Sequence, residues 1–536
     1  MTLKRVLLSL AVVLLPCAVH ADAPRQNTYT QPHVLRFAEA EDIAGLNPLL
    51  QTQSVVANLS QMTMGHLFKY DSRNLPIPEL ATAVPTKENG GISADGMTVV
   101  LHIRQHVKWS DGTPFDADDV VFSIDAMNNP ANNIPSRTGF DRITKVEEPN
   151  KSTVVLELKQ PYSPVVSMFD SFGGWAVLPK HILGSLPNIN NAPYNDLPIG
   201  IGPFRYTAWR RGDAVEMEAN PYYWRGRPKL DKIIYKLIPD RNTVLTQLQT
   251  GELDLWYPTG GAYLSRVENI PSVTVLRQPA YIYNHMDFNV RTPALRDVVV
   301  RRALELATNR AELLEKVAHG VGYLQESVLP EPYPGVSKIP FVSYDVAKAN
   351  VLLDRDGWKR GVDGIRVKNG LRLSIEVATS SGTPDVDVQL ELIRENWQQI
   401  GAEMTVKRYL SALLFAPREE GGIIFNSKFD VAVIAWSVPP VDDLRTGFGC
   451  DAIPPNGENI MNYCNHALDP LFDDFYRQYG AAAQGRDLSK IARIVAQDVP
   501  TVVTYSRQDV FAYNKDLKNF HPNNVTVFDD MMNVDI

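Results

Sequence analysis

The chain has 536 residues, of which 44% are apolar and 21% are charged. This balance is typical of globular proteins and excludes a disordered or collagen-like chain. The length exceeds what one hydrophobic core normally holds, so we expect two to four packed units. The 61 acidic residues outnumber the 53 basic ones, the formal net charge is −8, and no basic block occurs. Binding to nucleic acid or to an anionic membrane, which uses clustered Lys and Arg, is therefore disfavoured.

The N-terminus has the layout of a secretory signal peptide. Lys4 and Arg5 form a basic start, and the apolar stretch 6–16 that follows is too short to span a bilayer. Small residues come next, and cleavage after Ala21 would leave Asp22 as the first residue of the mature chain. We therefore expect the segment up to this site to be removed and the mature protein to be periplasmic.

The alternative is a lipoprotein signal, in which the sulfur of Cys17 would carry the lipid anchor. Pro16 directly before this cysteine fits that pattern poorly, because a small flexible residue is preferred there. No later stretch reaches 18 consecutive apolar residues, so we expect no membrane span in the mature protein.

After removal of the signal, Cys450 and Cys464 are the remaining cysteines. They lie 14 residues apart in a segment rich in Pro, Gly and Asn, and an oxidising compartment favours a bond between them. A disulfide closing this loop would contribute roughly 3 kcal/mol; the alternative is two unpaired thiols. No CxxC pair or His/Cys cluster surrounds them, so their spacing does not indicate a metal site.

Alternating strands and helices are predicted along the first half of the chain. Strands are expected at residues 98–103, 153–158, 232–237 and 253–255. Helices are expected from the N-capping Asp116 to Pro130 and from Asn242 to Gly251.

The second half is predicted to be more helical. Helices are expected over 296–307, from an Asn309–Glu312 capping box to Gly320, over 386–400, and from an Asp469–Pro470 cap to 479. Strands are expected at 404–408 and 431–434, with Trp436 following the end of the second one. Short strands joined by such helices indicate α/β lobes.

Sequence motifs of catalysis are absent from the chain, which contains no HExxH, GxSxG, GxxxxGK or GxGxxG. His102 and His106 lie about 13 Å apart along a predicted strand, which disfavours a shared metal. Asp118 and Asp119 suit the N-terminus of a helix, where negative charge is favourable. We therefore expect no catalytic residues, no metal site and no cofactor.

Eight segments in a fixed order carry a family resemblance. The most specific is 107–122, VKWSDGTPFDADDVVF, and the others are 40–48, 200–205, 220–224, 251–254, 297–303, 429–436 and 462–463. Together they resemble the extracellular solute-binding proteins of family 5, the peptide/nickel-type receptors of ABC importers. The turn at 111–114 lies between a strand and a capped helix, so we assign the most specific segment to the scaffold rather than to ligand contact.

The resemblance implies an α/β fold of the two-lobed periplasmic binding protein type (type II, the class with an extra inserted domain), with a ligand cleft between the lobes. It places the signal peptide at 1–21, lobe I at 22–65, 200–280 and 505–536, the inserted domain II at 66–199, and lobe II (domain III) at 281–504. Ligand binding would close the lobes in a hinge motion. The closed protein, expected to be a monomer, would then meet the permease subunits of an ABC importer in the inner membrane.

The ligand implied by the resemblance is a short peptide or a peptide-like solute. The same fold binding an opine, a glycoside or a metal chelate is one alternative. A secreted hydrolase built on this fold is another, because catalytic residues can lie far apart in sequence.

Trp436 matches the Trp that lines the pocket in this family. Peptide-binding members carry an Asp three residues later, which holds the amino group of the ligand, and here that position is Pro439. The Arg that some oligopeptide binders have three residues before the Trp is Val433 in this chain. Asp442 or Asp443 could supply negative charge to the cleft instead.

Four aromatic residues fall at the expected edges of the cleft: Trp256, Tyr257, Tyr281 and Tyr283. Each has two interpretations, a ligand contact or a half-buried aromatic that packs against its own lobe. With Trp436, Asp442 and Asp443 they form the predicted ligand-binding set.

The signal peptide gives a first test. Mass analysis of the protein exported by a bacterial host should give Asp22 as the first residue, because small side chains flank that bond. A mature terminus at a lipid-modified Cys17 would contradict this prediction and show a membrane anchor.

Overall fold

The computed structural model describes residues 27–536 except 41–42, 52, 173, 382–383, 417, 419–420 and 442. The predicted signal peptide, Cys17 and Asp442 therefore lie outside the described residues. Within the described part, no helix is both long and apolar enough to cross a membrane.

One large sheet organises the described chain. Eleven strands belong to it, in the order β17-β16-β18-β11-β19-β10-β1-β9-β8-β7, with β12 paired to β19 off this path. The bounds are β1 Val34–Glu39, β7 Phe204–Arg210, β8 Ala214–Ala219, β9 Lys232–Leu237, β10 Leu255–Trp256, β11 Val273–Phe288, β12 Gly322–Tyr323, β16 Ser374–Ser380, β17 Glu403–Tyr409, β18 Val431–Ser437 and β19 Thr501–Asn514.

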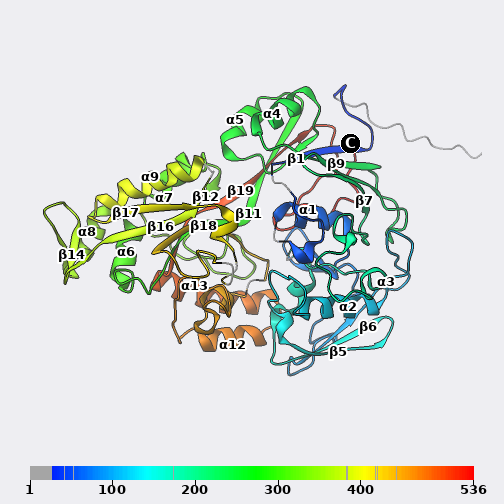
Figure 1. Ribbon diagram of the computed structural model, residues 1–536, viewed down its shortest axis with the longest axis horizontal. Helices are drawn as coiled ribbons and strands as arrows, with labels where there is room; N and C mark the ends of the chain where they lie inside the picture. Colours follow the sequence, from blue (N-terminus) through cyan, green and yellow to red (C-terminus); the bar gives the residue numbers. More distant parts are fainter. Residues whose placement is uncertain are drawn as a thin grey trace, which may run out of the picture.

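Strands β11 and β19 are the long central pair of this sheet and run through the middle of the molecule (Figure 1). They pair antiparallel from Val273 with Asn514 to Asp287 with Thr501, and the register shifts between Pro279 and Tyr283. One end of the pair bonds to β10, and the other end bonds to β18. The pair therefore belongs to both bodies of the protein.

The first body packs helices against β1 and β7–β10. Its helices are α1 Ser54–Thr63, α4 Arg241–Thr250 and α5 Leu264–Glu268. Phe37 of β1 lies in its core against the rings of Tyr235 and Phe528, with centroids 5.2 and 5.3 Å apart. Phe528 belongs to the C-terminal segment, which returns to this body after β19.

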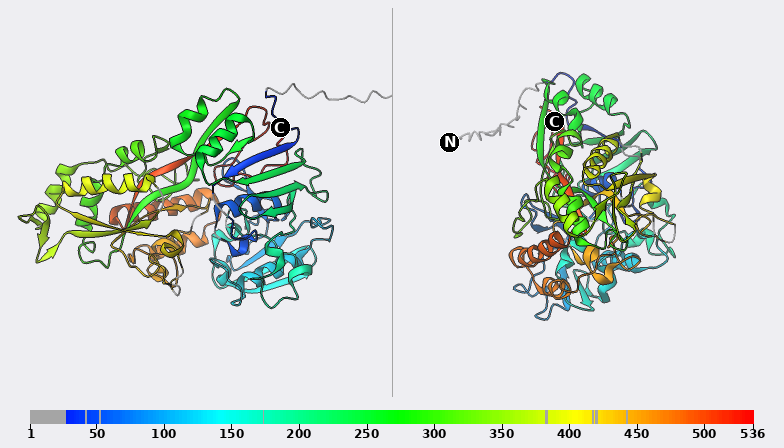
Figure 2. Two further views of the ribbon diagram at one scale, coloured as in Figure 1. Left: turned by 45° about the horizontal axis from the view of Figure 1, so that its top comes forward. Right: turned by 90° about the vertical axis from the view of Figure 1, so that its left-hand side faces the viewer.

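The second body contains β16–β18 and the helices around them (Figures 1 and 2), with α12 and α13 below these strands in Figure 1. The helices are α6 Val298–Leu306, α7 Arg310–Lys316, α8 Val346–Arg355, α9 Pro384–Gln398, α10 Ser411–Leu414, α11 Arg445–Phe448, α12 Asp469–Arg477 and α13 Ala481–Asp498, with a small sheet of β13 Lys359–Arg360, β14 Arg366–Lys368 and β15 Leu371–Arg372. Trp358 and Trp397 are buried in its core. The indole N–H of Trp397 donates to Thr308 Oγ1 at 3.0 Å, so this large ring is buried without an unpaired donor.

A third group of elements lies within residues 66–199. It comprises β2 Phe68–Tyr70, β3 Pro76–Pro78, β4 Thr98–His102, β5 Ile143–Asn150, β6 Thr153–Leu158, α2 Ala117–Asn128 and α3 Lys180–Leu183. Asp116 caps α2, and Asp119 completes the capping box. The indole N–H of Trp109 donates to Asp119 at 3.1 Å, which ties the 107–122 segment to its own core.

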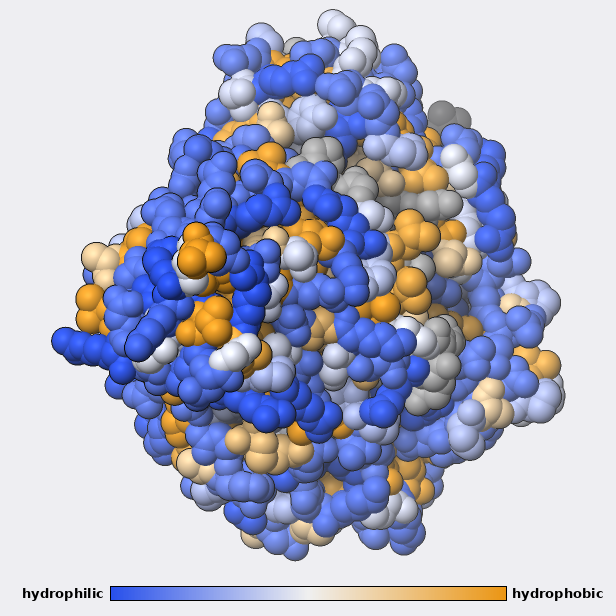
Figure 3. All heavy atoms as spheres, turned by 60° about the vertical axis from the view of Figure 1, so that its left-hand side comes forward, coloured by the Kyte–Doolittle hydropathy of each residue, from blue (hydrophilic) through white to orange (hydrophobic). Residues whose placement is uncertain are grey.

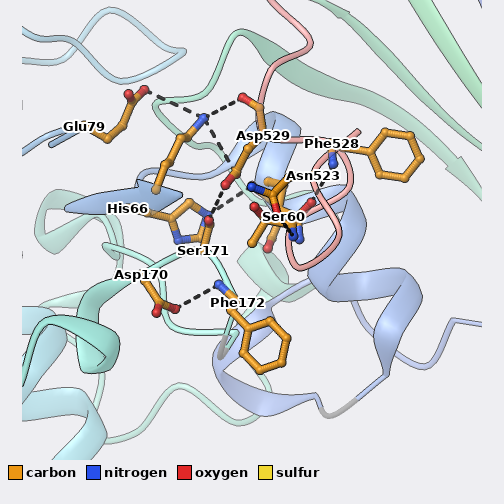
Figure 4. A network of polar contacts seen from close by, with 12 residues as sticks. Ser60, His66, Glu79, Asp170, Ser171, Phe172, Asn523, Phe528 and Asp529 are labelled. Carbon is orange, nitrogen blue, oxygen red and sulfur yellow. Dashed lines mark hydrogen bonds and ion pairs between the residues drawn. The ribbon is translucent and has the colours of Figure 1, made fainter. Parts of the chain in front are cut away.

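A buried polar network attaches this third group to the first body and the C-terminal segment (Figure 4). Lys69 Nζ donates to the backbone carbonyl of Asp529 at 3.1 Å and lies 3.8 Å from Glu79. Ser171 Oγ donates to the Asp529 carboxylate at 2.7 Å. The ammonium is almost fully buried, and Glu79 and Asp529 raise its pKa against the opposing effect of burial. Losing both carboxylates would leave the buried charge of Lys69 without a partner, which is costly.

Most predicted elements are present, although several of their ends differ from the prediction. Asp469 is the first residue of α12 and not its cap. The helix after Asn309 ends at Lys316 rather than at Gly320. Strand β18 extends to Ser437, so Trp436 lies inside the strand instead of beyond its end.

Cys450 and Cys464 form a disulfide in the second body. We predict that replacing both by Ser lowers the free energy of unfolding by roughly 3 kcal/mol, because the unfolded chain loses a short closed loop. Urea unfolding measures this, and wild-type protein treated with reductant should match the double variant. Two free thiols in denatured, unreduced protein would contradict the disulfide between Cys450 and Cys464.

Candidate functional site

A cavity of about 1130 Å³ lies where the three groups of elements meet. Its walls come from α1 and β10 in the first body, from the 66–199 elements, and from β18, α9 and α11 in the second. Residues of the strands β11 and β19 also line the cavity. A concave site of this size, with both apolar and polar side chains, is typical of a small-ligand site. The surface in Figure 3 is mostly hydrophilic, with apolar residues in small separate patches.

The structure brings six of the seven predicted residues to this cavity: Trp256, Tyr257, Tyr281, Tyr283, Trp436 and Asp443. The seventh, Asp442, lies outside the described residues. Pro439, at the position of the missing carboxylate, also lines the wall. Contact of the six predicted residues with a ligand stays a prediction. The neighbours of these residues differ from one to the next.

The four aromatic residues at the cleft edges are nearly fully buried. Tyr257 stacks on Phe511 with ring centroids 4.4 Å apart. The hydroxyl of Tyr281 donates to the backbone carbonyl of Pro332 at 2.7 Å and accepts from Asn74 at 2.8 Å. These contacts favour the packing interpretation for both tyrosines, which shape the wall and present little free surface.

Trp436 is half-buried and is the predicted aromatic with the most accessible ring. It pairs with Tyr283 across β18 and β11, and the ring of His285 meets the indole edge at 5.5 Å. Gly447 lies close to the six-membered ring, since a Cβ there would be 3.4 Å from it. The indole is therefore fixed in orientation before any ligand binds.

Asp443 has partners of its own. Its carboxylate accepts hydrogen bonds from Tyr476 at 2.9 Å and from Tyr162 at 3.3 Å. The guanidinium of Arg142 lies over both rings, 4.6 and 4.7 Å from their centroids. Burial raises the pKa of Asp443, an effect opposed by the bond from Tyr476 and by the charge of Arg142.

This cluster joins two bodies. Tyr162 and Arg142 belong to the 66–199 elements, whereas Asp443 and Tyr476 belong to the second body. The carboxylate of Asp443 thus connects the two sides of the cavity, a role that no sequence pattern predicted.

Several polar residues of the cavity wall were missed by sequence reasoning: Asn284, Gln389, Glu458, Arg507 and Asp509. Arg507 and Asp509 share one face of β19 with Tyr505, because side chains alternate along a strand. If the segment had been recognised as a strand at the cleft, this alternation would have predicted that Arg507 and Asp509 line the cavity. Glu458 lies in a loop and offered no such pattern.

Two groups of side chains have the geometry to hold a metal ion, within the part of the chain that is described: Asp116, Asp118 and Glu148, and Cys450, Cys464 and His466. Lys151 and Lys180 already pair with Asp118, and both cysteines are in the disulfide. Neither group lines the cavity.

Asp509 is a buried carboxylate in the cavity wall. The Tyr257 hydroxyl donates to it at 3.2 Å. Burial raises its pKa to about 6, although the Tyr257 bond and the nearby Arg507 charge oppose the shift. The folded protein therefore binds this proton more tightly than the unfolded chain, so ionisation between about pH 4 and pH 6 disfavours the folded state.

We predict that Asp509→Asn stabilises the ligand-free protein at pH 7.5 by up to about 3 kcal/mol. The amide oxygen still accepts from Tyr257 but carries no charge. At pH 4 the difference should vanish, because the wild-type carboxyl is then protonated. Thermal unfolding at both pH values measures this. Asp474→Asn on the exposed face of α12 is the control, and an equal shift at pH 4 and 7.5 would contradict the prediction.

The comparisons with known proteins agree on one family. The profile described as "Bacterial extracellular solute-binding proteins, family 5 Middle" matches residues 76–447. The oligopeptide-binding protein AppA of Bacillus subtilis is 28% identical over 486 residues, covering 89% of this chain and 87% of its own. The dipeptide-binding protein of Escherichia coli is 23% identical, covering 91% and 92%.

Solved structures agree on the two-lobed periplasmic binding protein fold. AppA from Bacillus subtilis, in complex with a nonapeptide, superposes with a TM-score of 0.80 at 24% identity, covering 94% of this chain and 99% of its own. NikZ from Campylobacter jejuni, in complex with Ni(L-His), gives 0.76 at 25% identity, covering 92% and 96%. Members of this family are extracellular or periplasmic solute receptors. The chain described here belongs to the bacterial extracellular solute-binding proteins of family 5.

Proposed function

We propose that this protein is the periplasmic substrate-binding protein of an ABC importer, which captures short peptides or peptide-like solutes and delivers them to permease subunits in the inner membrane. The observation that carries the proposal is the 1130 Å³ cavity enclosed by side chains from every body of the protein. A ligand held there contacts all of them, so binding energy is available to close the lobes.

The division into lobe I, the inserted domain and lobe II, with the bounds expected from the sequence, is part of the proposal. The change of register in β11 between Pro279 and Tyr283 supports a boundary near 280, and the elements of 66–199 form their own small sheets. The names of the relatives support a peptide ligand. A different solute is the second candidate, because Pro439 removes the amine-binding carboxylate and NikZ has this fold with a nickel–histidine complex.

Ligand identity can be read from the protein itself. Native mass spectrometry of protein purified from its host periplasm, followed by mass analysis after denaturation, should release short peptides of unchanged sequence. Release of an opine, a glycoside or a metal chelate would show that this solute, and not a peptide, is the ligand. Cleavage of added peptides over a long incubation would contradict a receptor.

We predict that Trp436→Ala weakens binding of the released ligand at least tenfold, because the fixed indole offers a large accessible ring for stacking. Calorimetry measures the affinity, and circular dichroism checks the fold. Trp209→Ala is the matched control, since this half-buried Trp on β7 lies outside the cavity. Unchanged affinity in a folded Trp436→Ala variant would show that the indole does not contribute to ligand binding.

A further inference from the structure

A second, smaller pocket lies on the second body. Its volume is about 400 Å³, and among the described residues it shares no wall residue with the ligand cavity. Cys464 and His466 line this pocket, and both are exposed. A pocket of this size admits a small molecule. Such a molecule would lie beside a sulfur of the disulfide that Cys464 forms with Cys450.

The imidazole of His466 lies between this sulfur and a carboxylate. Its Nε2 is 3.7 Å from Cys464 Sγ, and its Nδ1 is 2.8 Å from Asp469 Oδ2. A carboxylate accepts hydrogen bonds, so Nδ1 carries the proton and Nε2 presents its lone pair on the side of the sulfur. Both sulfurs and Nε2 lie within 4.8 Å of one another. One base is therefore within reach of either end of the S–S bond.

We propose that Cys450, Cys464 and His466 form a reducible disulfide site, which reacts with a small-molecule thiol bound in this pocket and thereby loosens one wall of the ligand cavity. Exposed disulfides exchange with external thiols, whereas well-protected ones resist reduction. The exposed Cys464 and the neighbouring base meet both needs of such an exchange, which are access to a sulfur and a thiolate to attack it. The reaction does not depend on which solute the receptor carries.

The exchange takes two steps. His466 Nε2 accepts the proton of the bound thiol, and the thiolate attacks Cys464 Sγ. The S–S bond breaks as the new one forms, and Cys450 leaves as a thiolate that takes the proton from the imidazolium. A second thiol then attacks the outer sulfur of the mixed disulfide and releases Cys464 as a thiol. The protein disulfide is reduced to two thiols, and two molecules of the small thiol are oxidised to their disulfide.

The segment closed by this disulfide belongs to the wall of the ligand cavity. Glu458 lies within the segment and lines the cavity, as do Thr446 and Gly447 just before it. The backbone N–H of Glu458 donates to the Thr446 carbonyl at 2.9 Å. A Cβ on Gly447 would be 3.4 Å from the ring of Trp436. The order of the closed segment therefore affects the wall next to the indole.

Asn459 is the second tie between the ends of the segment. Its side chain is fully buried, and Nδ2 donates to the carbonyls of Gly449 at 2.9 Å and of Tyr463 at 2.6 Å. These two residues adjoin the two cysteines in the chain. Once the disulfide is broken, hydrogen bonds such as these hold the ends together without a covalent bond. The segment should then open locally more often.

The rate of disulfide reduction tests the site. Folded protein is incubated at pH 7 with 2-mercaptoethanol and quenched by alkylation, and the reduced fraction is measured by mass spectrometry. His466→Gln should lower the second-order rate constant at least about tenfold, because the base is lost. His521→Gln, which changes an exposed histidine of the C-terminal segment, is the control and should react like the wild type.

The same measurement in urea separates the folded site from the chemistry of the cysteines. All three proteins should react at one rate when unfolded, because the imidazole is then no longer held beside the sulfur. Equal rate constants for the wild type and folded His466→Gln would overturn the site. A difference between these two proteins that persists in urea would overturn it as well.

Hydrogen exchange tests the link to the cavity wall. In the double variant Cys450→Ser/Cys464→Ser, the backbone N–H groups of 446–460 should exchange at least about tenfold faster than in the wild type at labelling times under a minute, which report local opening. Strand β6 in the third group, Thr153–Leu158, should exchange alike in both proteins. Equal exchange of 446–460 in the two proteins, or an equal increase in β6, would overturn the link between the disulfide and the wall.

Discussion

The antiparallel pair of β11 and β19 is the constraint on which the rest of the structure depends. Strand β18 bonds to one end of the pair and β10 to the other, so each body of the protein is an extension of the same two strands. Their ladder is interrupted near Pro279–Tyr283. Any relative motion of the two bodies has to bend the pair there, because an interrupted ladder is the least costly place to change direction.

The third group of elements has no strand in this sheet. Backbone hydrogen bonds such as Leu46 N–H to the Asn195 carbonyl at 2.9 Å and several side-chain contacts attach it. On one side, Lys69 and Ser171 of this group bond to Asp529 of the C-terminal segment. On the other, Tyr162 bonds Asp443 of the second body. The first attachment is a buried ion cluster, which is costly to take apart. The second consists of hydrogen bonds at the cavity wall, which can separate when the lobes open. Because of this difference, we propose that 66–199 moves together with the first body when the lobes open.

Sequence patterns predicted the local elements well, because a strand such as 153–158 or the cap at Asp116 depends on neighbours in the chain. They also located Trp436 at the cavity, through the family resemblance. They could not find the bond between Arg507 and Asn284, which joins residues 223 positions apart through the register of β11 and β19. The partners of Asp443 escaped for the same reason, and a carboxylate expected to face the ligand is occupied by tyrosine hydroxyls.

Pro439 has a consequence for the charges of the cavity. With no carboxylate at that position, the acids of the wall are Glu39, Asp385, Asp443, Glu458 and Asp509. Asp443 and Asp509 accept hydrogen bonds from tyrosine hydroxyls, Glu39 accepts one from Asn58, and Asp385 lies 4.0 Å from His319 Nε2. The described residues provide no ion pair for Glu458. A neutral ligand would displace water from Glu458 and Arg507 without replacing the interactions that the water made with these charges. A ligand with an ammonium and a carboxylate would pair both charges, and under the proposed function we expect peptides with free ends to bind more tightly than uncharged solutes of the same size.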